Sequence, residues 1–336
     1  MSVTTTSKSN ELLVEVKELR KYFPAPSRSL LHGKAAYIKA VDGVSFDIRR
    51  GETLGLVGES GCGKSTTARC VLRLYDPTSG EVCFDGRNLQ SLSSRDMRQM
   101  RRRMQMVFQD PYSSLNPRMK VGEIIGEALK VHRLSTNGGG YRQRITELLE
   151  AVGLSRGMAD RYPGQFSGGQ RQRIGIARAL AASPEFIVCD EPVSALDVST
   201  QAKIVNLLKD LQAQFNVTYL VIAHDLSVVR HMSDRIAVMY LGHIVEMSAS
   251  EEMCSQPLHP YTKALLSVAP IPEPRLLRTR KRIILIGDIP SPLSPPPGCV
   301  FHPRCPAAKP QCKETAPELR QVGDSHFVAC TNSAAC

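Results

Sequence analysis

The sequence predicts an α/β fold, with a mostly parallel sheet covered by helices, a helical insertion and a C-terminal extension. Three observations support this prediction. Strand-like and helix-like segments alternate with short turns from Glu11 to about Ser255, as in sheets joined by helical crossovers. Strand signals vanish between Gln109 and Ser183. After Pro257 the composition shifts towards proline, which predicts an extended appendage.

Individual elements follow from the spacing of apolar residues and from turn residues. Short runs of β-branched and apolar residues predict strands at 12–16, 37–41, 44–48, 53–57, 81–86, 186–190 and 218–225. Helical periodicity predicts helices at 123–134, 141–154, 168–183 and 204–215. The glycine run 137–140 predicts a flexible loop inside the helical stretch.

Composition narrows the class of protein. No stretch approaches the ~18 consecutive apolar residues of a membrane span, and the N-terminus does not resemble a secretory signal. We therefore expect a cytosolic chain that reaches a membrane only through a partner. The net charge of +11 permits nucleic-acid binding. However, the basic clusters at 98–103 and 275–282 lack interleaved aromatics, and an anionic membrane surface would also suit a positive protein.

A glycine-rich run lies between a predicted strand and a predicted helix. It consists of Gly58, Glu59, Ser60, Gly61, Cys62, Gly63, Lys64 and Ser65, with Thr66 following. This spacing fits a phosphate-binding loop, in which backbone N–H groups surround phosphates at a helix N-terminus. We expect Lys64 to reach the β- and γ-phosphates of ATP and the Ser65 hydroxyl to bind Mg²⁺. The alternative is a chance glycine-rich turn.

An acidic pair ends a later apolar strand. Asp190 completes the run FIVCD and would hold Mg²⁺, directly or through water. Glu191 comes next and is placed to polarise the attacking water as a general base. An acidic pair after a strand is often only a helix cap, so the pair alone is weak evidence.

The segment before this strand connects the chain to a family. Ser167, Gly168, Gly169 and Gln170 follow Phe166, and this run is similar to the LSGGQ signature of ABC ATPases. A serine N-cap opening a helix is the plainer interpretation, and both can hold. The order of phosphate loop, signature, acidic pair and histidine also matches the family. The resemblance implies a P-loop ABC ATPase domain at 1–255, with an antiparallel β subdomain and a helical subdomain at about 110–183.

The same resemblance assigns further positions one at a time. Gln109 matches the glutamine that touches Mg²⁺ or water and contacts membrane subunits. Asp197, in the run 194–197, matches the dimer-contact loop, and His224 matches the histidine that contacts the γ-phosphate. Phe23 is the best match for the aromatic that stacks on adenine, with Tyr22 beside it as the competing choice. In this family two subunits sandwich two ATP molecules, and the signature of one serves the other.

Nearly the whole chain resembles the ATPases of oligopeptide and dipeptide importers. The supporting runs are GESGCGKST, QDPYSSLNPRM, AHDLSVVRHMSDRIAVMYLGHIVE, HPYTKALL and GCVFHPRCPAA. The resemblance implies a second homologous ATPase, two integral membrane permeases, a substrate-binding protein and a location on the cytoplasmic face of the inner membrane. We expect no nucleic-acid partner. The rival is an ABC ATPase of nucleic-acid maintenance or translation, which typically has paired ATPase units, coiled coils or zinc modules.

Four cysteines in the 256–336 extension form a candidate metal site. Cys299, Cys305, Cys312 and Cys330 are separated by five, six and seventeen residues. Four thiolates suit a structural zinc ion or an iron–sulfur cluster, and this spacing does not choose between them. Four buried, unliganded cysteines are the alternative, although a segment poor in large apolar residues usually needs a staple. The resemblance to peptide-import ATPases favours a [4Fe–4S] cluster. Cys336 lies outside the pattern and is expected to be a free thiol.

Overall fold

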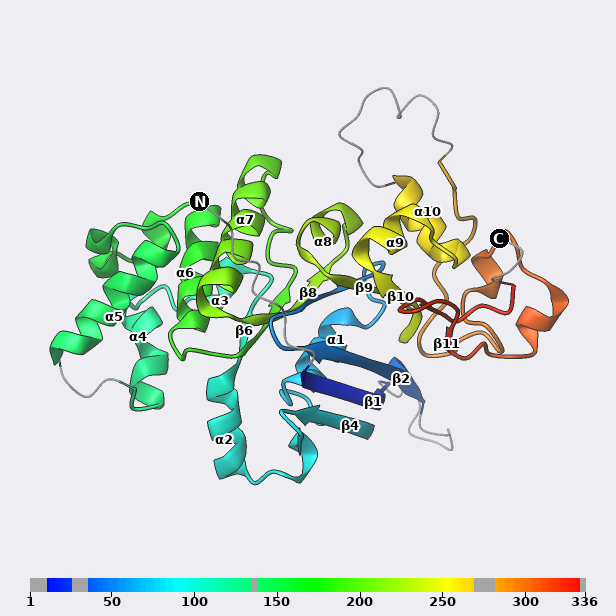
Figure 1. Ribbon diagram of the computed structural model, residues 1–336, viewed down its shortest axis with the longest axis horizontal. Coiled ribbons are helices and arrows are strands. Elements are labelled where there is room, and N and C mark those ends of the chain that lie inside the picture. The colour runs from blue at the N-terminus through cyan, green and yellow to red at the C-terminus, as the bar shows by residue number, and fades with distance from the viewer. Residues whose placement is uncertain (1–10, 26–35, 135–137, 269–281, 333–336) are drawn as a thin grey trace. The chain divides into compact units, whose positions relative to one another are not determined.

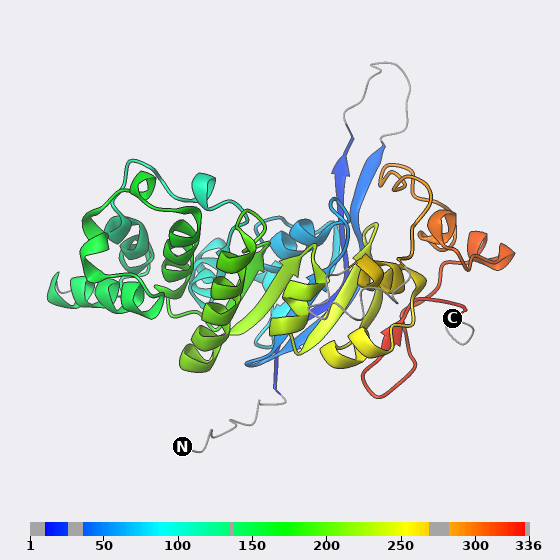
Figure 2. The same cartoon turned by 90° about the horizontal axis from the view of Figure 1, so that it is seen from above.

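The computed structural model describes residues 11–25, 36–134, 138–268 and 282–332. The chain divides into two compact units, and each is described by itself. Unit 1 comprises Met1–Leu12, Ile48–Thr53 and Ser91–Ile222, and unit 2 comprises Leu13–Asp47, Leu54–Gln90 and Ala223–Cys336. Figures 1 and 2 show their elements. Cys336 lies outside the described residues.

Unit 1 contains a parallel sheet and most of the helices. Its strands are β6 (Met104–Val107), β7 (Phe186–Asp190) and β8 (Thr218–Ala223), the last residue of which belongs to unit 2. Its helices are α2 (Ser94–Arg103), α3 (Pro111–Ser114), α4 (Val121–Val131), α5 (Gly138–Ala151), α6 (Gly168–Leu180) and α7 (Val198–Phe215). β7 pairs in parallel with both β6 and β8, and every residue of β7 and β8 is buried. Continuous burial explains why these strands are uninterrupted apolar runs.

The stretch predicted to be helical contains α3, α4, α5 and α6, together with 3₁₀ turns at Arg156–Asp160 and Pro163–Gln165. In Figure 2 these helices form one group, and α4 packs against both α5 and α6. Among the described residues of 110–183 there is no strand, as predicted. The glycine run was interpreted wrongly, because α5 begins at Gly138 and includes the glycines.

Unit 2 is built mainly from strands. They are β1 (Leu12–Pro24), β2 (Tyr37–Arg49), β3 (Thr53–Val57), β4 (Ser79–Phe84), β5 (Arg87–Asn88), β9 (Arg235–Tyr240), β10 (His243–Ala249), β11 (Arg320–Gln321) and β12 (Phe327–Val328). Its helices are α1 (Lys64–Val71), α8 (Leu226–Met232), α9 (Ser250–Ser255) and α10 (Pro260–Val268). β1, β4 and β5 pair antiparallel, which agrees with the predicted antiparallel subdomain. β3 pairs in parallel with β9.

The C-terminal extension differs from the predicted extended appendage. It begins with helix α10, and its strand β12 pairs antiparallel with β10. The buried carboxylate of Glu246 on β10 accepts hydrogen bonds from the backbone N–H groups of Leu258 and His259, and it pairs with His326 at 2.7 Å. A buried carboxylate is stable only when it is paired or hydrogen-bonded. These contacts therefore link β10 to the start of the extension and to the segment that contains His326.

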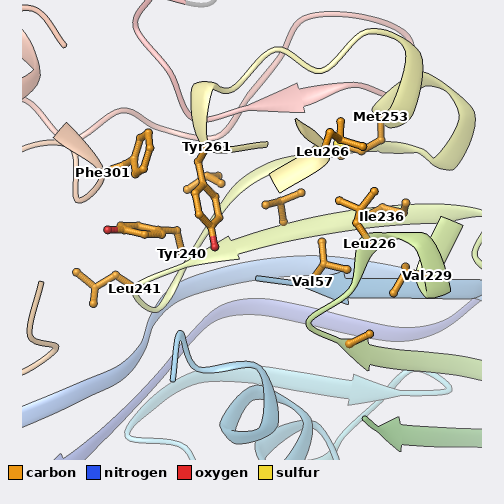
Figure 3. Packing of buried hydrophobic residues seen from close by; sticks show 13 residues of the cluster. Val57, Leu226, Val229, Ile236, Tyr240, Leu241, Met253, Tyr261, Leu266 and Phe301 are labelled. Carbon is orange, nitrogen blue, oxygen red and sulfur yellow. The ribbon is translucent and has the colours of Figure 1, made fainter. Parts of the chain in front are cut away.

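The extension also shares the core of unit 2. Phe301 is fully buried in a cluster with residues of β3, α8, β9, α9 and α10 (Figure 3). The segment therefore uses an existing core in place of one of its own. No helix in the described parts of the chain is both long enough and apolar enough to cross a bilayer.

Candidate functional site

The phosphate loop lies in unit 2 between β3 and α1, as predicted. Gly63 has φ of +110°, and a Cβ atom there would lie 2.1 Å from the carbonyl oxygen of Ala40. A Cβ atom on Gly58 would lie 2.1 Å from the carbonyl oxygen of Met239. Only glycine fits at such distances. The loop therefore has a backbone shape that requires glycine at these two positions.

The lysine side chain of the loop forms hydrogen bonds with the backbone of the same loop. Lys64 is almost completely buried, and its Nζ atom donates hydrogen bonds to the carbonyl oxygens of Gly58 at 2.7 Å and Glu59 at 2.9 Å. Ser65 and Thr66 follow in the first turn of α1 and are partly exposed. That turn carries no acidic residue, so no carboxylate in it opposes the binding of an anion at the N-terminus of α1.

The acidic pair lies at the end of β7 in unit 1. Asp190 is buried, and the next residue, Glu191, has φ of +45°, which is uncommon outside glycine and is often found at functional sites. The Glu191 N–H donates to the carbonyl oxygen of Ile222 at 3.0 Å. The following helix, α7, begins at Val198 and is capped by Asp197. The pair is therefore not the cap of that helix.

Gln109 meets Glu191 although 82 residues separate them. The Gln109 Nε2 atom donates to Glu191 Oε2 at 2.8 Å. Gln109 itself follows β6, which is adjacent to β7 in the sheet. Because the carboxyl ends of parallel neighbouring strands lie together, the sheet explains how two predicted site residues come into contact.

The signature run opens helix α6. Ser167 Oγ accepts a hydrogen bond from the Gln170 N–H at 3.3 Å, and Gln170 Oε1 accepts one from the Ser167 N–H at 3.0 Å. This reciprocal capping box confirms the N-cap interpretation. A Cβ atom on Gly169 would lie 2.5 Å from Thr200 Cγ2, whereas on Gly168 it would lie 3.3 Å from Leu196 Cδ2. The glycines therefore allow α6 to approach the start of α7.

Asp197 is held as a carboxylate. Its oxygens accept hydrogen bonds from Ser199 Oγ at 2.7 Å, Thr200 Oγ1 at 2.8 Å and the Thr200 N–H at 3.0 Å. These hydrogen bonds, led by that of Ser199, hold the pKa of Asp197 well below its usual range. Asp197 is therefore ionised at neutral pH at the N-terminus of α7, where negative charge is favourable.

Two predicted residues of unit 2 lie outside the loop. Phe23 packs edge-to-face against Tyr75, with ring centroids 5.6 Å apart. The neighbouring Tyr22 hydroxyl donates to Asp42 Oδ1 at 2.5 Å, and burial followed by this hydrogen bond raises the pKa of Tyr22 to about 12. Both aromatic side chains therefore have partners within unit 2, and the assignment of Phe23 as the stacking aromatic remains a prediction. His224 is exposed directly after β8, and its catalytic role remains a prediction.

Two residues that the sequence did not predict contact the phosphate loop. The Tyr261 hydroxyl accepts a hydrogen bond from the Glu59 N–H at 2.9 Å, and the Arg304 guanidinium pairs with the Glu59 carboxylate at 2.7 Å. These residues are separated from Glu59 by 202 and 245 positions. No local pattern in the sequence indicates contacts at such separations.

The four predicted cysteine ligands line one cavity of the extension, together with His259, Phe301 and Asn332. Asn332 donates from its N–H to Cys330 Sγ at 3.4 Å and from Nδ2 to Cys312 Sγ at 3.8 Å. Burial raises the pKa of Cys305 to about 11 and also raises that of Cys299. Among the described residues, however, no three His, Cys, Asp or Glu side chains are arranged to hold one metal ion. The predicted metal site therefore has no coordination geometry to support it.

Comparisons with known proteins identify the family. Residues 41–194 match the family model described as ABC transporter, and residues 245–312 match the model for the oligopeptide/dipeptide transporter C-terminal region. The putative oligopeptide transport ATP-binding protein YkfD of Bacillus subtilis is 57% identical over 95% of this chain and 94% of its own. The chain belongs to this family of ABC transporter ATP-binding proteins.

Other relatives agree with this family assignment. The oligopeptide transport ATP-binding proteins AppF of Bacillus subtilis and OppF of Haemophilus influenzae are 54% and 48% identical over 97% of this chain, and each is matched over 98% of its own length. A solved dimeric ATP-binding cassette in a post-hydrolysis state with ADP and Pi is 32% identical, with a TM-score of 0.62 over 71% of this chain and 99% of that chain. The fold is therefore that of an ABC ATPase cassette, and the chemistry of the family is ATP hydrolysis.

The backbone shape of the phosphate loop can be tested at Gly63. We expect Gly63→Ala to weaken ATP binding by more than about tenfold, because a Cβ atom must displace either the loop or β2. Gly86→Ala is the matched control, since Gly86 also has positive φ (+72°) but open space around it. It should cost about 1–2 kcal/mol of stability and leave ATP affinity unchanged. Calorimetric titration with ATP and urea unfolding measure both effects. Equal ATP affinities for the two variants would contradict this account.

Proposed function

We propose that this protein is the ATP-hydrolysing subunit of an importer of dipeptides, oligopeptides or a related small solute. The observation that carries the catalytic part is the arrangement at the end of β7, where Glu191 follows the buried Asp190 and accepts a hydrogen bond from Gln109. The class of cargo is supported by the C-terminal family match and by the names of the relatives.

The residues of the phosphate loop bind the triphosphate in this proposal. Lys64 supplies a positive charge to the β- and γ-phosphates, and the N–H groups at the start of α1 supply donors. The Gln109 side-chain oxygen and the Asp190 carboxylate of unit 1 would each offer an oxygen donor to Mg²⁺, as would the Ser65 hydroxyl of unit 2. Oxygen donors of this kind are what Mg²⁺ prefers, and the ion neutralises charge that develops on the phosphates. Phe23 stacks on the adenine, and His224 contacts the γ-phosphate.

Glu191 acts as the general base on the attacking water. Each oxygen of an ionised carboxylate has two lone pairs, so Glu191 can accept a hydrogen bond from Gln109 and another from water. The Gln109 contact and the Glu191 N–H bond to Ile222 restrict the carboxylate, which is the positioning that phosphoryl transfer requires.

The proposal includes a second, homologous ATPase subunit. Ser167 is exposed at the N-terminus of α6, and Gly168 and Gly169 follow in its first turn. A helix N-terminus is suited to binding phosphate. The related cassette solved with ADP and Pi is dimeric, which supports a sandwich in which this signature serves the nucleotide of the partner. Two permease subunits and a substrate-binding protein would complete the transporter, with this chain at the cytoplasmic face of the inner membrane.

We further propose that Cys299, Cys305, Cys312 and Cys330 hold a structural [4Fe–4S] cluster. All four line the same cavity, and N–H groups of Asn332 reach two of the sulfurs, as expected around metal-bound thiolates. A zinc ion needs four sulfurs at one point, whereas a cluster binds each thiolate through a different iron. A cluster that binds each thiolate through its own iron would occupy a cavity between the four thiols, and the four cysteines line one cavity.

The role of Glu191 can be tested in the assembled transporter. Glu191→Gln should leave ATP binding intact and reduce steady-state hydrolysis by at least about a hundredfold, because the amide cannot accept the proton of water. Glu81→Gln, on the exposed side of β4, is the control and should hydrolyse ATP normally. Phosphate release measures the rate. Hydrolysis by Glu191→Gln at the wild-type rate would show that Glu191 is not the base.

The cluster can be tested by composition. Protein purified without oxygen should be brown and contain iron and sulfide in equal amounts, and Cys305→Ser should lose both. Cys83→Ser, on β4 and outside the group of four, should keep them. Colourless protein with one zinc per chain would reject the cluster and keep the ligands, and metal-free protein would reject both.

A further inference from the structure

The Glu59 residue of the phosphate loop is held at all three of its polar groups. Its side chain pairs with Arg304, its N–H donates to Tyr261, and its carbonyl oxygen accepts from Lys64. Tyr261 lies on α10 and Arg304 lies in the extension, so both come from the C-terminal part of the chain. One residue of the loop thus connects the C-terminal part to the lysine that binds phosphate.

The contact with Arg304 has the geometry of a strong ion pair. Arg304 Nη1 lies 2.7 Å from Glu59 Oε2, and Nη2 lies 3.2 Å from Oε1, so the guanidinium binds the carboxylate through both nitrogens. The side chains are only 8% and 24% exposed. Two-pronged contacts of this kind fix orientation as well as distance, and burial protects them from screening.

The Tyr261 hydroxyl is fixed by packing. Tyr261 is fully buried, and its ring centroid lies 4.8 Å from that of Tyr240 and 5.3 Å from that of Phe301 (Figure 3). Arg304 also lies over the Tyr240 ring, at 5.9 Å from its centroid. Aromatic rings packed in this way leave the hydroxyl one position, which is against the loop.

Other contacts also attach the extension to unit 2. The pairing of β12 with β10 and the contacts of Glu246 with His326 already join the extension to unit 2. Phe301 adds a fully buried ring to the core. The Arg304 and Tyr261 contacts differ from these because they end on the phosphate loop. A role in positioning that loop is therefore the hypothesis that they suggest.

We propose that Arg304 and Tyr261 are positioning residues for the phosphate loop. They hold Glu59 so that its carbonyl oxygen and that of Gly58 keep the Lys64 ammonium in place for the phosphates. The C-terminal extension is thereby part of the nucleotide-binding apparatus. This inference rests on the proposed function, since it needs the loop to bind ATP.

The test compares ATP affinities of full-length variants. Arg304→Met should raise the Kd for MgATP about tenfold or more, the effect expected when a charge-assisted hydrogen bond is lost. Tyr261→Phe removes one hydroxyl and keeps the ring, so it should raise the Kd about two- to tenfold. Arg304→Lys keeps the positive charge but cannot bind the carboxylate through two nitrogens. Its Kd should therefore lie between those of Arg304→Met and the wild type. The matched controls are Arg282→Met and Tyr37→Phe, both at exposed positions, and they should bind as the wild type does.

Urea unfolding of every variant separates positioning from stability. The inference holds if Tyr261→Phe and the Arg304 variants are folded in the titration buffer and bind ATP more weakly than their controls. It is overturned if folded Tyr261→Phe and Arg304→Lys bind ATP within twofold of the wild type, and these two variants decide the matter if Arg304→Met does not fold. Wild-type protein that fails to bind ATP would reject the proposed function itself, so the two failures are distinguishable.

Discussion

The close approach of the phosphate loop to two neighbouring strands is the constraint on which unit 2 depends. At Gly63 and Gly58 the loop passes so near the carbonyl oxygens of Ala40 on β2 and Met239 on β9 that no side chain fits. The loop therefore takes its shape from strands that are distant in sequence. The buried Lys64 is satisfied by the carbonyl oxygens that this shape turns inward. Without that backbone path, the buried Lys64 ammonium would lack these acceptors.

Local sequence patterns predicted the parts of the site that a short segment builds alone. The phosphate loop and the capping box at Ser167 belong to this class, because each needs only a few consecutive residues in one geometry. Contacts between distant segments could not be predicted in this way. The hydrogen bond from Gln109 to Glu191 depends on the pairing of β6 with β7, and the Arg304 pair depends on where the extension docks. The glycines of α5 show that a local pattern can also mislead. They are typical of a turn and predicted a loop, but they lie in a helix.

The C-terminal extension shows how a segment poor in large apolar residues becomes ordered. It inserts Phe301 into the core of unit 2 and adds β12 to β10, so it does not depend on a core of its own. Four of its cysteines line one cavity. A cluster there would act as a staple for a segment that also supplies Arg304 to the phosphate loop. In this account the extension serves nucleotide binding as well as its own folding.

We propose that the chain is one half of an ATPase whose sites are completed by a partner. The most direct measurement is the steady-state rate of ATP hydrolysis by the purified chain, alone and after reconstitution with its homologous ATPase subunit and permeases. We predict a low rate for the isolated chain and a rate that rises on assembly, because the exposed signature at Ser167 would serve the nucleotide bound by the partner. An isolated monomer that hydrolyses ATP as fast as the assembled transporter would contradict the account.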